Sequence, residues 1–260
     1  HFTDRRQRQM CIRDRALAQK EGFAEPDPTF DISGQDAAQK TSILATLSFF
    51  QNSSMEKVYF EGIDKISPDD IDYGKQLNFV LKPLSVGMQN KDQITLGSFP
   101  AFVKTDSLLA SIQNENNAVL VNAENVGGTM YSGPGAGAKP TANSVLSDVI
   151  DIARGKIFDY GKFVEQNLSS SFDNFSCDRY LKLQVNDKPG VVAKISTLLA
   201  KNNLSIDNLI QKELERSDDQ IPLVMVLSNS DETTIQDTIK ELEALDEVSG
   251  PLTHIRILDI

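Results

Sequence analysis

The strongest chemical signal in the sequence is a carboxylate and an amine four residues apart, Asp36 and Lys40. Both fall in a helix that the apolar periodicity predicts from about Gln35 to Gln51, and at about 100° per residue they share one stripe. The same stripe carries three apolar side chains: Ile43, Leu47 and Phe50. One interpretation is an exposed ion pair, which contributes only about 0.3–0.5 kcal/mol. The other is a proton-transfer site, because burial beside an apolar face makes a lysine a proton donor or acceptor near neutral pH.

A glycine-rich loop forms the second candidate. Gly133, Gly135 and Ala138 satisfy the G-x-G-x-x-A spacing of a dinucleotide-binding turn, between a short strand and a helix predicted from Ala142 to Arg154. A dinucleotide-binding fold needs a second buried strand after that helix, and Ile157–Gly161 is too short and too polar to supply one. We therefore interpret the loop as backbone N–H groups at a helix N-terminus, with a plain tight turn as the alternative.

The composition limits the classes of protein that fit. With 260 residues and 40% hydrophobic content, the chain is long enough for one large domain or two ordinary ones. Its formal net charge of -11 argues against a nucleic-acid partner, which requires clustered lysines and arginines. No apolar run approaches the ~20 residues of a membrane span and no secretory signal is recognisable, so we predict no membrane partner and a cytoplasmic location.

The residues that usually bind metals are scarce. The chain has two cysteines, Cys11 and Cys177, and two histidines, His1 and His254. They are too few for a disulfide framework and lack metal-ligand spacing. We therefore expect no metal site built by the protein.

The first fifteen residues differ in character from the rest. His1–Arg15 is dense in arginine and has neither helical nor strand periodicity. Arg5–Asp14 back-translates in one frame into a transposase adapter used in DNA sequencing, so we interpret 1–15 as an adapter scar. An organellar transit peptide is the alternative. The natural sequence is then expected to begin near Ala16.

The remaining elements predict an α+β fold. Over 16–162, periodicity and turn signals indicate one domain around a mixed sheet, which we take to be the catalytic domain. Its predicted helices are Gln35–Gln51, one that opens at Ser67, and Ala142–Arg154. Its predicted strands are Val58–Gly62, Asn78–Val86, Gln93–Phe102 and Ala118–Ala123.

A second, smaller domain is predicted at the C-terminus. The serine- and asparagine-containing stretch 163–178 loses periodicity and is predicted to be a linker. The elements that follow are a strand Tyr180–Val185, a helix Val191–Asn202, strands Ser205–Glu213 and Ile221–Ser228, a helix Thr233–Ala244 and a strand Leu252–Leu258. The order βαββαβ is that of a ferredoxin-like domain, here over 179–260.

Several of these segments together resemble one enzyme family. Gly22–Pro28, Asp31 and Gly34–Lys40 are similar, in order and spacing, to the substrate-binding signature of homoserine dehydrogenases. The similarity continues through Glu61–Ile63, Asp70–Ile71, Asn117–Ala118 and the glycine loop followed by Pro140–Ala142. The chain thus resembles the C-terminal part of such an enzyme, without its upstream Rossmann domain. Asn143, where many relatives carry serine, is a departure from the family's pattern.

The resemblance implies roles for four residues at the substrate. Lys40 would deliver a proton to the carbonyl oxygen of aspartate semialdehyde, and would accept the hydroxyl proton of homoserine in reverse. Glu25 and Asp36 would hold the substrate's ammonium group, because charge-assisted hydrogen bonds both anchor and orient it. Asp31 would support them from the same loop.

The resemblance also implies NADP or NAD as the cofactor. Gly22 would lie close to it, where a side chain would obstruct the approach, and Gly137 and then Gly135 would contact it from the glycine loop. The family's main cofactor-binding domain, with a second active-site lysine and a monovalent-cation site, has no counterpart in this sequence. We therefore expect the polypeptide on its own to be inactive.

The C-terminal segment resembles an ACT domain, a small-molecule sensor. Asn186, Asp187, Gly190 and Val191 form its strand-to-helix turn, where free backbone donors suit an amino-acid carboxylate. The resemblance implies feedback by an amino-acid end product, typically threonine. The alternative is a structural module that dimerises edge to edge, and in either case we expect a homo-oligomer.

The expected function follows from the resemblance. It is the NAD(P)-dependent interconversion of L-homoserine and L-aspartate 4-semialdehyde in threonine, methionine and isoleucine biosynthesis, with feedback through the ACT domain. The alternative is a non-enzymatic amino-acid-binding regulatory protein that kept only the sensor. The presence or absence of an upstream Rossmann domain would separate the two hypotheses.

Overall fold

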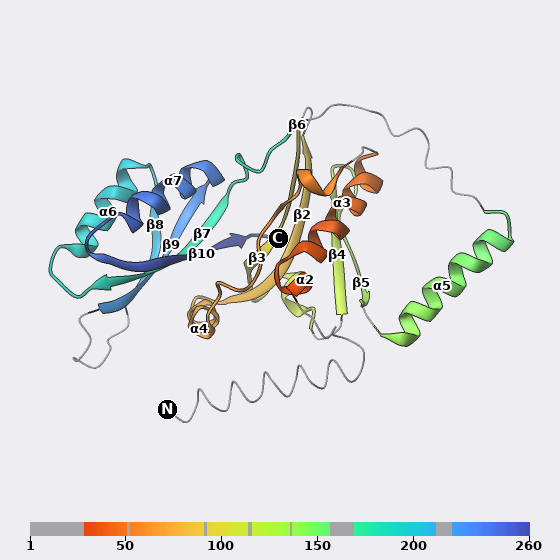
Figure 1. Ribbon diagram of the computed structural model, residues 1–260, viewed down its shortest axis with the longest axis horizontal. Coiled ribbons are helices and arrows are strands. Elements are labelled where there is room, and N and C mark those ends of the chain that lie inside the picture. Colours follow the sequence, from red (N-terminus) through yellow and green to blue (C-terminus); the bar gives the residue numbers. More distant parts are fainter. Residues whose placement is uncertain are drawn as a thin grey trace, which may run out of the picture. The chain divides into compact units, whose positions relative to one another are not determined.

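A computed structural model describes residues 29–50, 53–90, 93–113, 116–135, 137–156, 169–211 and 220–260 (Figure 1). The chain divides into two compact units, one formed by 1–30 and 108–163 and the other by 31–107 and 164–260. Three predictions from the sequence, the adapter segment 1–15, Gly22 and Glu25, lie outside the described residues. No helix within the described ranges is long and apolar enough to cross a membrane.

The larger unit is built on one mixed sheet. Its strands lie in the order β1-β3-β10-β7-β9-β8, with β2 and β6 also paired to β3. The bounds are β1 Tyr59–Phe60, β2 Phe79–Asn90, β3 Gln93–Lys104, β6 Ser169–Ser170, β7 Cys177–Asn186, β8 Ile206–Gln211, β9 Gln220–Ser230 and β10 Val248–Leu258. Strands β1, β6 and β10 run parallel to β3, whereas the other pairs are antiparallel. The predicted mixed sheet is therefore confirmed.

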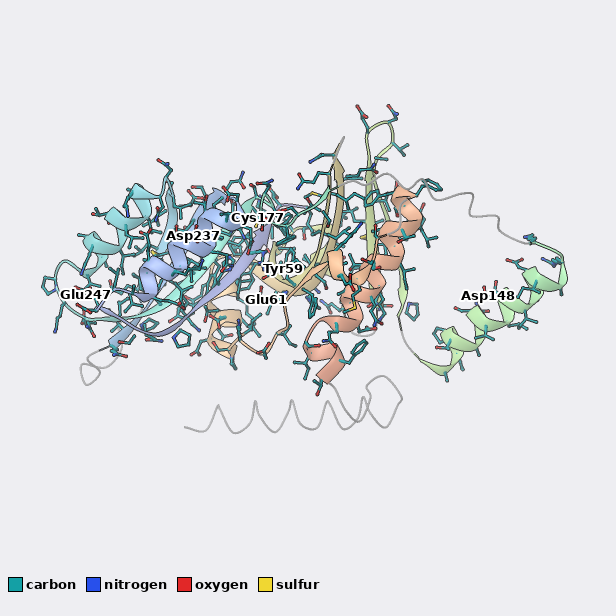
Figure 2. All side chains as sticks on the ribbon, turned by 45° about the horizontal axis from the view of Figure 1, so that its top comes forward. Tyr59, Glu61, Asp148, Cys177, Asp237 and Glu247 are labelled. Atoms are coloured by element: carbon teal, nitrogen blue, oxygen red, sulfur yellow. The ribbon has the colours of Figure 1, made fainter. Side chains whose placement is uncertain are left out.

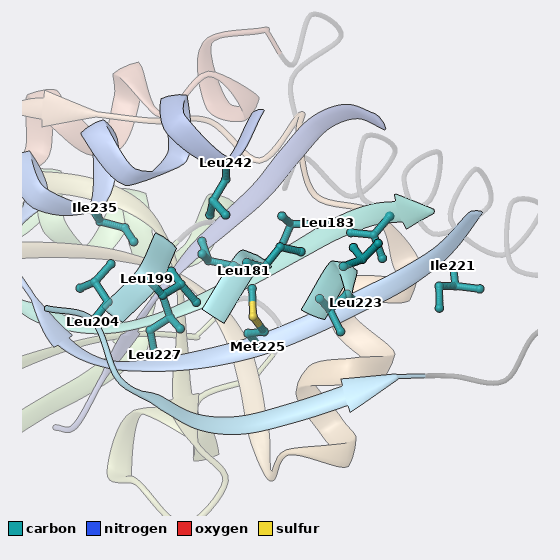
Figure 3. Packing of buried hydrophobic residues seen from close by; sticks show 13 residues of the cluster. Leu181, Leu183, Leu199, Leu204, Ile221, Leu223, Met225, Leu227, Ile235 and Leu242 are labelled. Atoms are coloured by element: carbon teal, nitrogen blue, oxygen red, sulfur yellow. The ribbon is translucent and has the colours of Figure 1, made fainter. Parts of the chain in front are cut away.

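The C-terminal part of this sheet has the predicted βαββαβ order. Helices α6 (Val191–Lys201) and α7 (Glu232–Glu243) follow β7 and β9, respectively, and pack on the sheet (Figure 3). Alternate residues of β7 face the helices, and Leu181 and Leu183 there are fully buried. Helix α6 contributes residues at three- and four-residue spacing to the same core, including Leu199. Each such leucine stabilises the fold by about 1.5–3 kcal/mol, so apolar patterning accounts for this domain.

The N-terminal part of the larger unit supplies two helices. Helix α3 (Gln35–Phe49) coincides with the predicted helix and lies beside β2 and β3 (Figure 1). Helix α4 (Pro68–Gln76) begins as the sequence predicts, because Ser67 and Asp70 form a capping box ahead of the first turn. Two short pieces complete this part: α2 (Thr29–Ile32) and the 3-10 turn η1 (Met55–Lys57).

The described end of the predicted linker, 169–178, is packed rather than extended. Strand β6 pairs with β3, and the ring of Phe172 stacks on Tyr59 with 4.4 Å between ring centroids. Phe175 is buried against Phe172 and Phe99. The two phenylalanines are surrounded by serines and other polar residues, so this stretch shows no apolar periodicity. Each aromatic ring nevertheless buries enough surface to fix a short segment against the sheet.

The two predicted domains share one sheet. Strand β10, the last of the βαββαβ unit, pairs in parallel with β3, so that Ile257 lies opposite Phe102. Nothing in the local patterns of either strand indicates this pairing, because it joins residues more than 150 positions apart.

Where its residues are described, the smaller unit contains a hairpin, a 3-10 turn and a long helix. Strands β4 (Asn116–Ala123) and β5 (Gly127–Pro134) pair along their full length, after η2 (Leu108–Ser111). Strand β5 was not predicted, because its glycines and terminal proline weaken the strand pattern while pairing with β4 overrides it. Helix α5 (Ala138–Ala153) starts four residues before the predicted Ala142, since Pro140 is tolerated in a first turn whose N–H groups lack helical partners.

Candidate functional site

Asp36 and Lys40 form the predicted pair on helix α3. The Lys40 Nζ donates to Asp36 Oδ2 at 2.6 Å, and the two side chains are 65% and 33% exposed. Spacing and direction suit an i,i+4 ion pair, with the acid nearer the helix N-terminus. The amine is therefore tethered to a carboxylate and open to solvent on the described surface. This exposed geometry is that of the ion-pair interpretation; the burial invoked for proton transfer is not seen around Lys40 in the described residues, and the role of Lys40 stays a prediction.

The expectation that this stripe is the buried face of α3 is wrong within the described part of the chain. The helix packs through Ala38, Thr41 and Ala45 instead, all of which are buried. The residues that share the stripe of Lys40 are exposed: Ile43 60%, Leu47 43% and Phe50 64%. Small side chains let the helix approach β3 closely, so size decides the buried face more than hydropathy does.

The turn before α3 is held by a neighbouring segment. Gly34 precedes the helix with a φ of +82° and no side-chain cap, and a Cβ there would lie 2.9 Å from the Glu61 carbonyl oxygen. The amide of Ile63 donates to the carbonyl of Ile32 at 3.1 Å. A Cβ on Gly62 would lie 2.5 Å from that same carbonyl oxygen. Glycines at 34 and 62 are therefore required for this close approach.

Beside this turn lies a buried cluster of charges that sequence reasoning missed. Arg256 of β10 donates to Glu232 at 2.6 Å and to Glu61 at 2.8 Å, and also donates to the Tyr59 hydroxyl at 3.0 Å. Figure 2 labels Tyr59 and Glu61 among the side chains. Arg179 of β7 donates to Glu232 at 2.8 Å. The available signal was an arginine inside each of two apolar strands, because such residues are rarely buried unless paired.

Aromatic rings pack around the arginine cluster, and its charged groups stay ionised. The Arg256 guanidinium lies 4.5–5.3 Å from three ring centroids: those of Tyr59, Phe99 and Phe172. Burial alone would raise the pKa of Glu232, yet Arg256 and Arg179 outweigh it and lower that pKa to about 2. Burial raises the pKa of Tyr59 to about 12, so its hydroxyl keeps its proton. The carboxylate is therefore ionised and the phenol is neutral.

A second polar cluster joins α4 to β7. Asp70, which is fully buried, accepts from the Tyr180 hydroxyl at 3.0 Å and pairs with Lys182 Nζ at 2.6 Å. Lys182 also donates to the Ser67 hydroxyl at 2.8 Å. Burial and the Asp70 carboxylate raise the pKa of Tyr180, so its hydroxyl keeps the proton that it donates to Asp70. Asp70, a member of the capping box of α4, thus also anchors that helix on β7.

His254 lies beside the arginine cluster and has no hydrogen-bond partner for Nε2 among the described residues. Burial, with Arg256 and Arg179, lowers its pKa to about 3 from the ordinary 6.5. Between these values the unfolded chain binds a proton that the native state does not. Stability therefore falls as pH drops through this window, by about 1.4 kcal/mol per pH unit from this group.

We expect His254→Leu to remove that share of the acid sensitivity. Urea unfolding of both proteins between pH 7 and pH 4 should show a shallower loss of stability in the variant, by up to about one proton's slope. Carboxylates such as Glu232 titrate in both proteins and cancel in the difference. Parallel stability curves over this range would contradict the assignment.

The predicted glycine loop precedes α5. Gly137 caps the helix with φ 115°, ψ 151° and no side-chain hydrogen bond. A Cβ on Gly135 would lie 1.8 Å from Nδ2 of the Asn117 side chain, so the loop backbone passes close to β4. Because no side chain caps the first turn, its backbone N–H groups suit an anionic or carboxamide group, as the cofactor prediction requires.

The predicted effector turn lies between β7 and α6. Asn186 ends β7 and its amide donates to the Glu247 carbonyl at 2.9 Å. Gly190 precedes α6 with a φ of +93° and no side-chain cap, while Val191 is buried. Asp187 follows Asn186 directly. The helix start thus has no side-chain cap, although the Val191 amide donates to the Lys188 carbonyl at 3.3 Å, and the same turn carries the Asp187 carboxylate.

The remaining predicted residues are only partly visible. Asp31 lies in α2, but its side chain is not described, and Gly22 and Glu25 lie outside the described residues. Among the described residues, no group of three or more histidine, cysteine, aspartate or glutamate side chains could hold a metal ion. The three described candidates lie on separate elements: Lys40 and Asp36 on α3, the glycine loop before α5, and the effector turn before α6. Their roles stay predictions.

Comparisons with known proteins give two family matches. The homoserine dehydrogenase family matches residues 12–150, and the ACT domain family matches residues 179–247. The first match includes the pair on α3 and the glycine loop, and the second includes the effector turn.

Relatives extend the similarity over nearly the whole chain. Homoserine dehydrogenase from Pseudomonas aeruginosa is 38% identical over 253 residues, covering 93% of this chain and 58% of that protein. The enzyme from Neisseria gonorrhoeae is 38% identical over 251 residues, covering 92% and 57%. A crystal structure of homoserine dehydrogenase from Thiobacillus denitrificans is 33% identical with a TM-score of 0.82, covering 94% and 57%. The chain thus spans somewhat more than half the length of these relatives.

Proposed function

This chain belongs to the homoserine dehydrogenase family and carries an ACT domain, and from that premise we propose that it provides the substrate-binding half of an NAD(P)-dependent oxidoreductase. The full-length protein would interconvert L-homoserine and L-aspartate 4-semialdehyde in threonine, methionine and isoleucine biosynthesis. The observation that carries this proposal is the Asp36–Lys40 pair, accessible to solvent on a helix that the family match includes.

Lys40 is the proposed proton-transfer group. During reduction its ammonium gives a proton to the carbonyl oxygen, and during oxidation its amine takes the proton of the hydroxyl. Asp36, 2.6 Å away, holds the amine in place and presents a carboxylate to the substrate's ammonium group. Glu25 and Asp31 are proposed to complete that pocket.

When bound, a nicotinamide cofactor would supply hydride-transfer chemistry to the substrate that Lys40 and Asp36 are proposed to hold. The residues present fit such a group: Gly137 and Gly135 leave the start of α5 free of side-chain caps, so backbone N–H groups can contact it. Gly22 is proposed to lie at the same cofactor. NADP and NAD are equally compatible with these backbone contacts.

The ACT domain is proposed to bind an amino acid, with threonine as the first candidate. The Gly190 amide would donate to its carboxylate, joined by the Val191 amide once that amide exchanges its 3.3 Å bond to the Lys188 carbonyl for the ligand, and Asp187 or Asn186 would accept from its ammonium group. Inhibition requires that the ligand bind an inactive arrangement more tightly than an active one. A homo-oligomer joined through such domains is the proposed assembly.

One assay tests the proposal. In the protein extended to the full length of its relatives, we expect L-homoserine to drive reduction of NADP or NAD, and millimolar threonine to slow that reaction. Chemically similar L-serine is the control substrate and should give at least ~100-fold lower kcat/KM, since it is one methylene shorter and misplaces the hydroxyl. Threonine binding by calorimetry without any oxidation of homoserine would instead support the non-enzymatic amino-acid-binding protein.

A further inference from the structure

Helix α3 begins, at the end that carries Asp36, with a long hydrogen bond from the Gln35 amide to the Ser33 hydroxyl at 3.4 Å. Gly34 precedes it without a side-chain hydrogen bond, and the first backbone bond of the helix runs from the Ala38 amide to the Gly34 carbonyl at 2.9 Å. Contacts between Gly34 and residues outside the helix therefore help to orient the first turn.

That contact is Glu61. Its carbonyl would lie 2.9 Å from a Cβ on Gly34, and its amide donates to the Ser98 carbonyl of β3 at 2.9 Å. The next residues, Gly62 and Ile63, contact the carbonyl of Ile32. The backbone of Glu61 is thus fixed between the sheet and the turn that starts α3.

The Glu61 side chain is fixed in turn by the last strand of the ACT domain. Its Oε2 accepts from Arg256 at 2.8 Å and from the Tyr59 hydroxyl at 3.0 Å. Arg256 is 1% exposed and is held on its other side by Glu232, so it cannot follow a displaced Glu61. The Glu61 side chain is 21% exposed, which makes it the accessible end of the cluster.

We propose that Glu61 is a positioning residue for the first turn of α3, held by Arg256 so that Asp36 and Lys40 keep one orientation. In catalytic terms the inference rests on the proposed function, because only then do these two residues meet the substrate. Physically, the contacts run from Arg256 on β10 through the Glu61 carboxylate and backbone to Gly34, which precedes α3. Glu61 itself is not proposed to touch substrate.

Amide hydrogen exchange on the 260-residue chain tests this without substrate or cofactor. In Glu61→Ala we expect the amides of 35–41 to exchange about tenfold faster, while those of β7 and β9 keep their rates. Glu61→Gln should restore protection to within about threefold of the original chain, because its amide oxygen still accepts from Arg256. Glu247→Ala, which removes the carboxylate that pairs with Lys194 at 2.8 Å in the same domain, is the matched control and should leave 35–41 unchanged.

Two outcomes would overturn the proposal. One is an unchanged exchange rate over 35–41 in Glu61→Ala, and the other is an equal acceleration in 35–41 and in β7 and β9, which would indicate a general loss of stability. Failure of Lys40 as a proton-transfer group would leave this result untouched, since exchange reports only the backbone.

Discussion

Lys40→Ala in the full-length protein is expected to lower kcat by roughly 10²–10⁴-fold while the affinity for the nicotinamide cofactor stays close to that of the original protein. The reason is the role proposed for its amine, which exchanges a proton with the substrate oxygen and has no proposed contact with the cofactor. Steady-state rates with homoserine, together with cofactor titration by fluorescence, measure the two quantities separately.

Lys40→Arg distinguishes proton transfer from ion pairing. Arginine keeps a positive charge that can pair with Asp36, yet it stays protonated at all ordinary pH values. We expect this variant to be nearly as inactive as the alanine variant. Lys75→Ala, which removes a 67% exposed lysine paired with Asp72 at i,i+3 on α4, is the control and should retain turnover. Normal turnover in Lys40→Ala would leave Asp36 and Lys40 as a surface ion pair only.

Arg256→Met is expected to lower the free energy of unfolding by about 3–5 kcal/mol. The substitution keeps an apolar side chain between the three aromatic rings but takes one of two arginines from the buried Glu232, and leaves Glu61 without its arginine. Urea unfolding of the 260-residue chain measures the change as a shift in midpoint at constant slope.

Two companions make that measurement specific. In the double variant Arg256→Met with Glu232→Gln, the loss should be smaller than the sum of the single losses, because residue 232 no longer carries the buried charge that Arg256 had paired. Lys104→Met on the neighbouring strand β3 removes a lysine that pairs with Asp259 at 2.9 Å in solvent, and its midpoint should stay nearly unchanged. Equal shifts for Arg256→Met and Lys104→Met would mean that burial adds nothing to the Arg256 pairs.

The resemblance to the family's signature could be recognised in the sequence because the signature lies in a short segment. Gly34, Asp36 and Lys40 lie within seven consecutive residues, and the spacing of four places two side chains on one helix face whatever surrounds the helix. The βαββαβ order was equally legible, since alternation in β7 and the three- and four-residue spacing in α6 are properties of single segments.

Which face of α3 is buried could not be predicted in this way. The apolar stripe through Ile43 and Leu47 suggested one face, but the sheet accepts the face of Ala38 and Ala45 because their small side chains fit against β3. Strand β5 was missed for a related reason, since its pairing partner β4 compensates for glycines that weaken it alone.

The sequence by itself indicated the family, through its resemblance to a known signature, and predicted the element order of the C-terminal domain and the candidate site residues, because these depend on short segments. Tertiary structure alone decided that β10 pairs with β3 and that Arg256 meets Glu61, 195 positions away. Such contacts depend on burial energies summed over many residues and on charges that are stable inside the protein only when paired. The contacts of Glu61 with Arg256 and with the turn before α3 could therefore be found only in the folded chain.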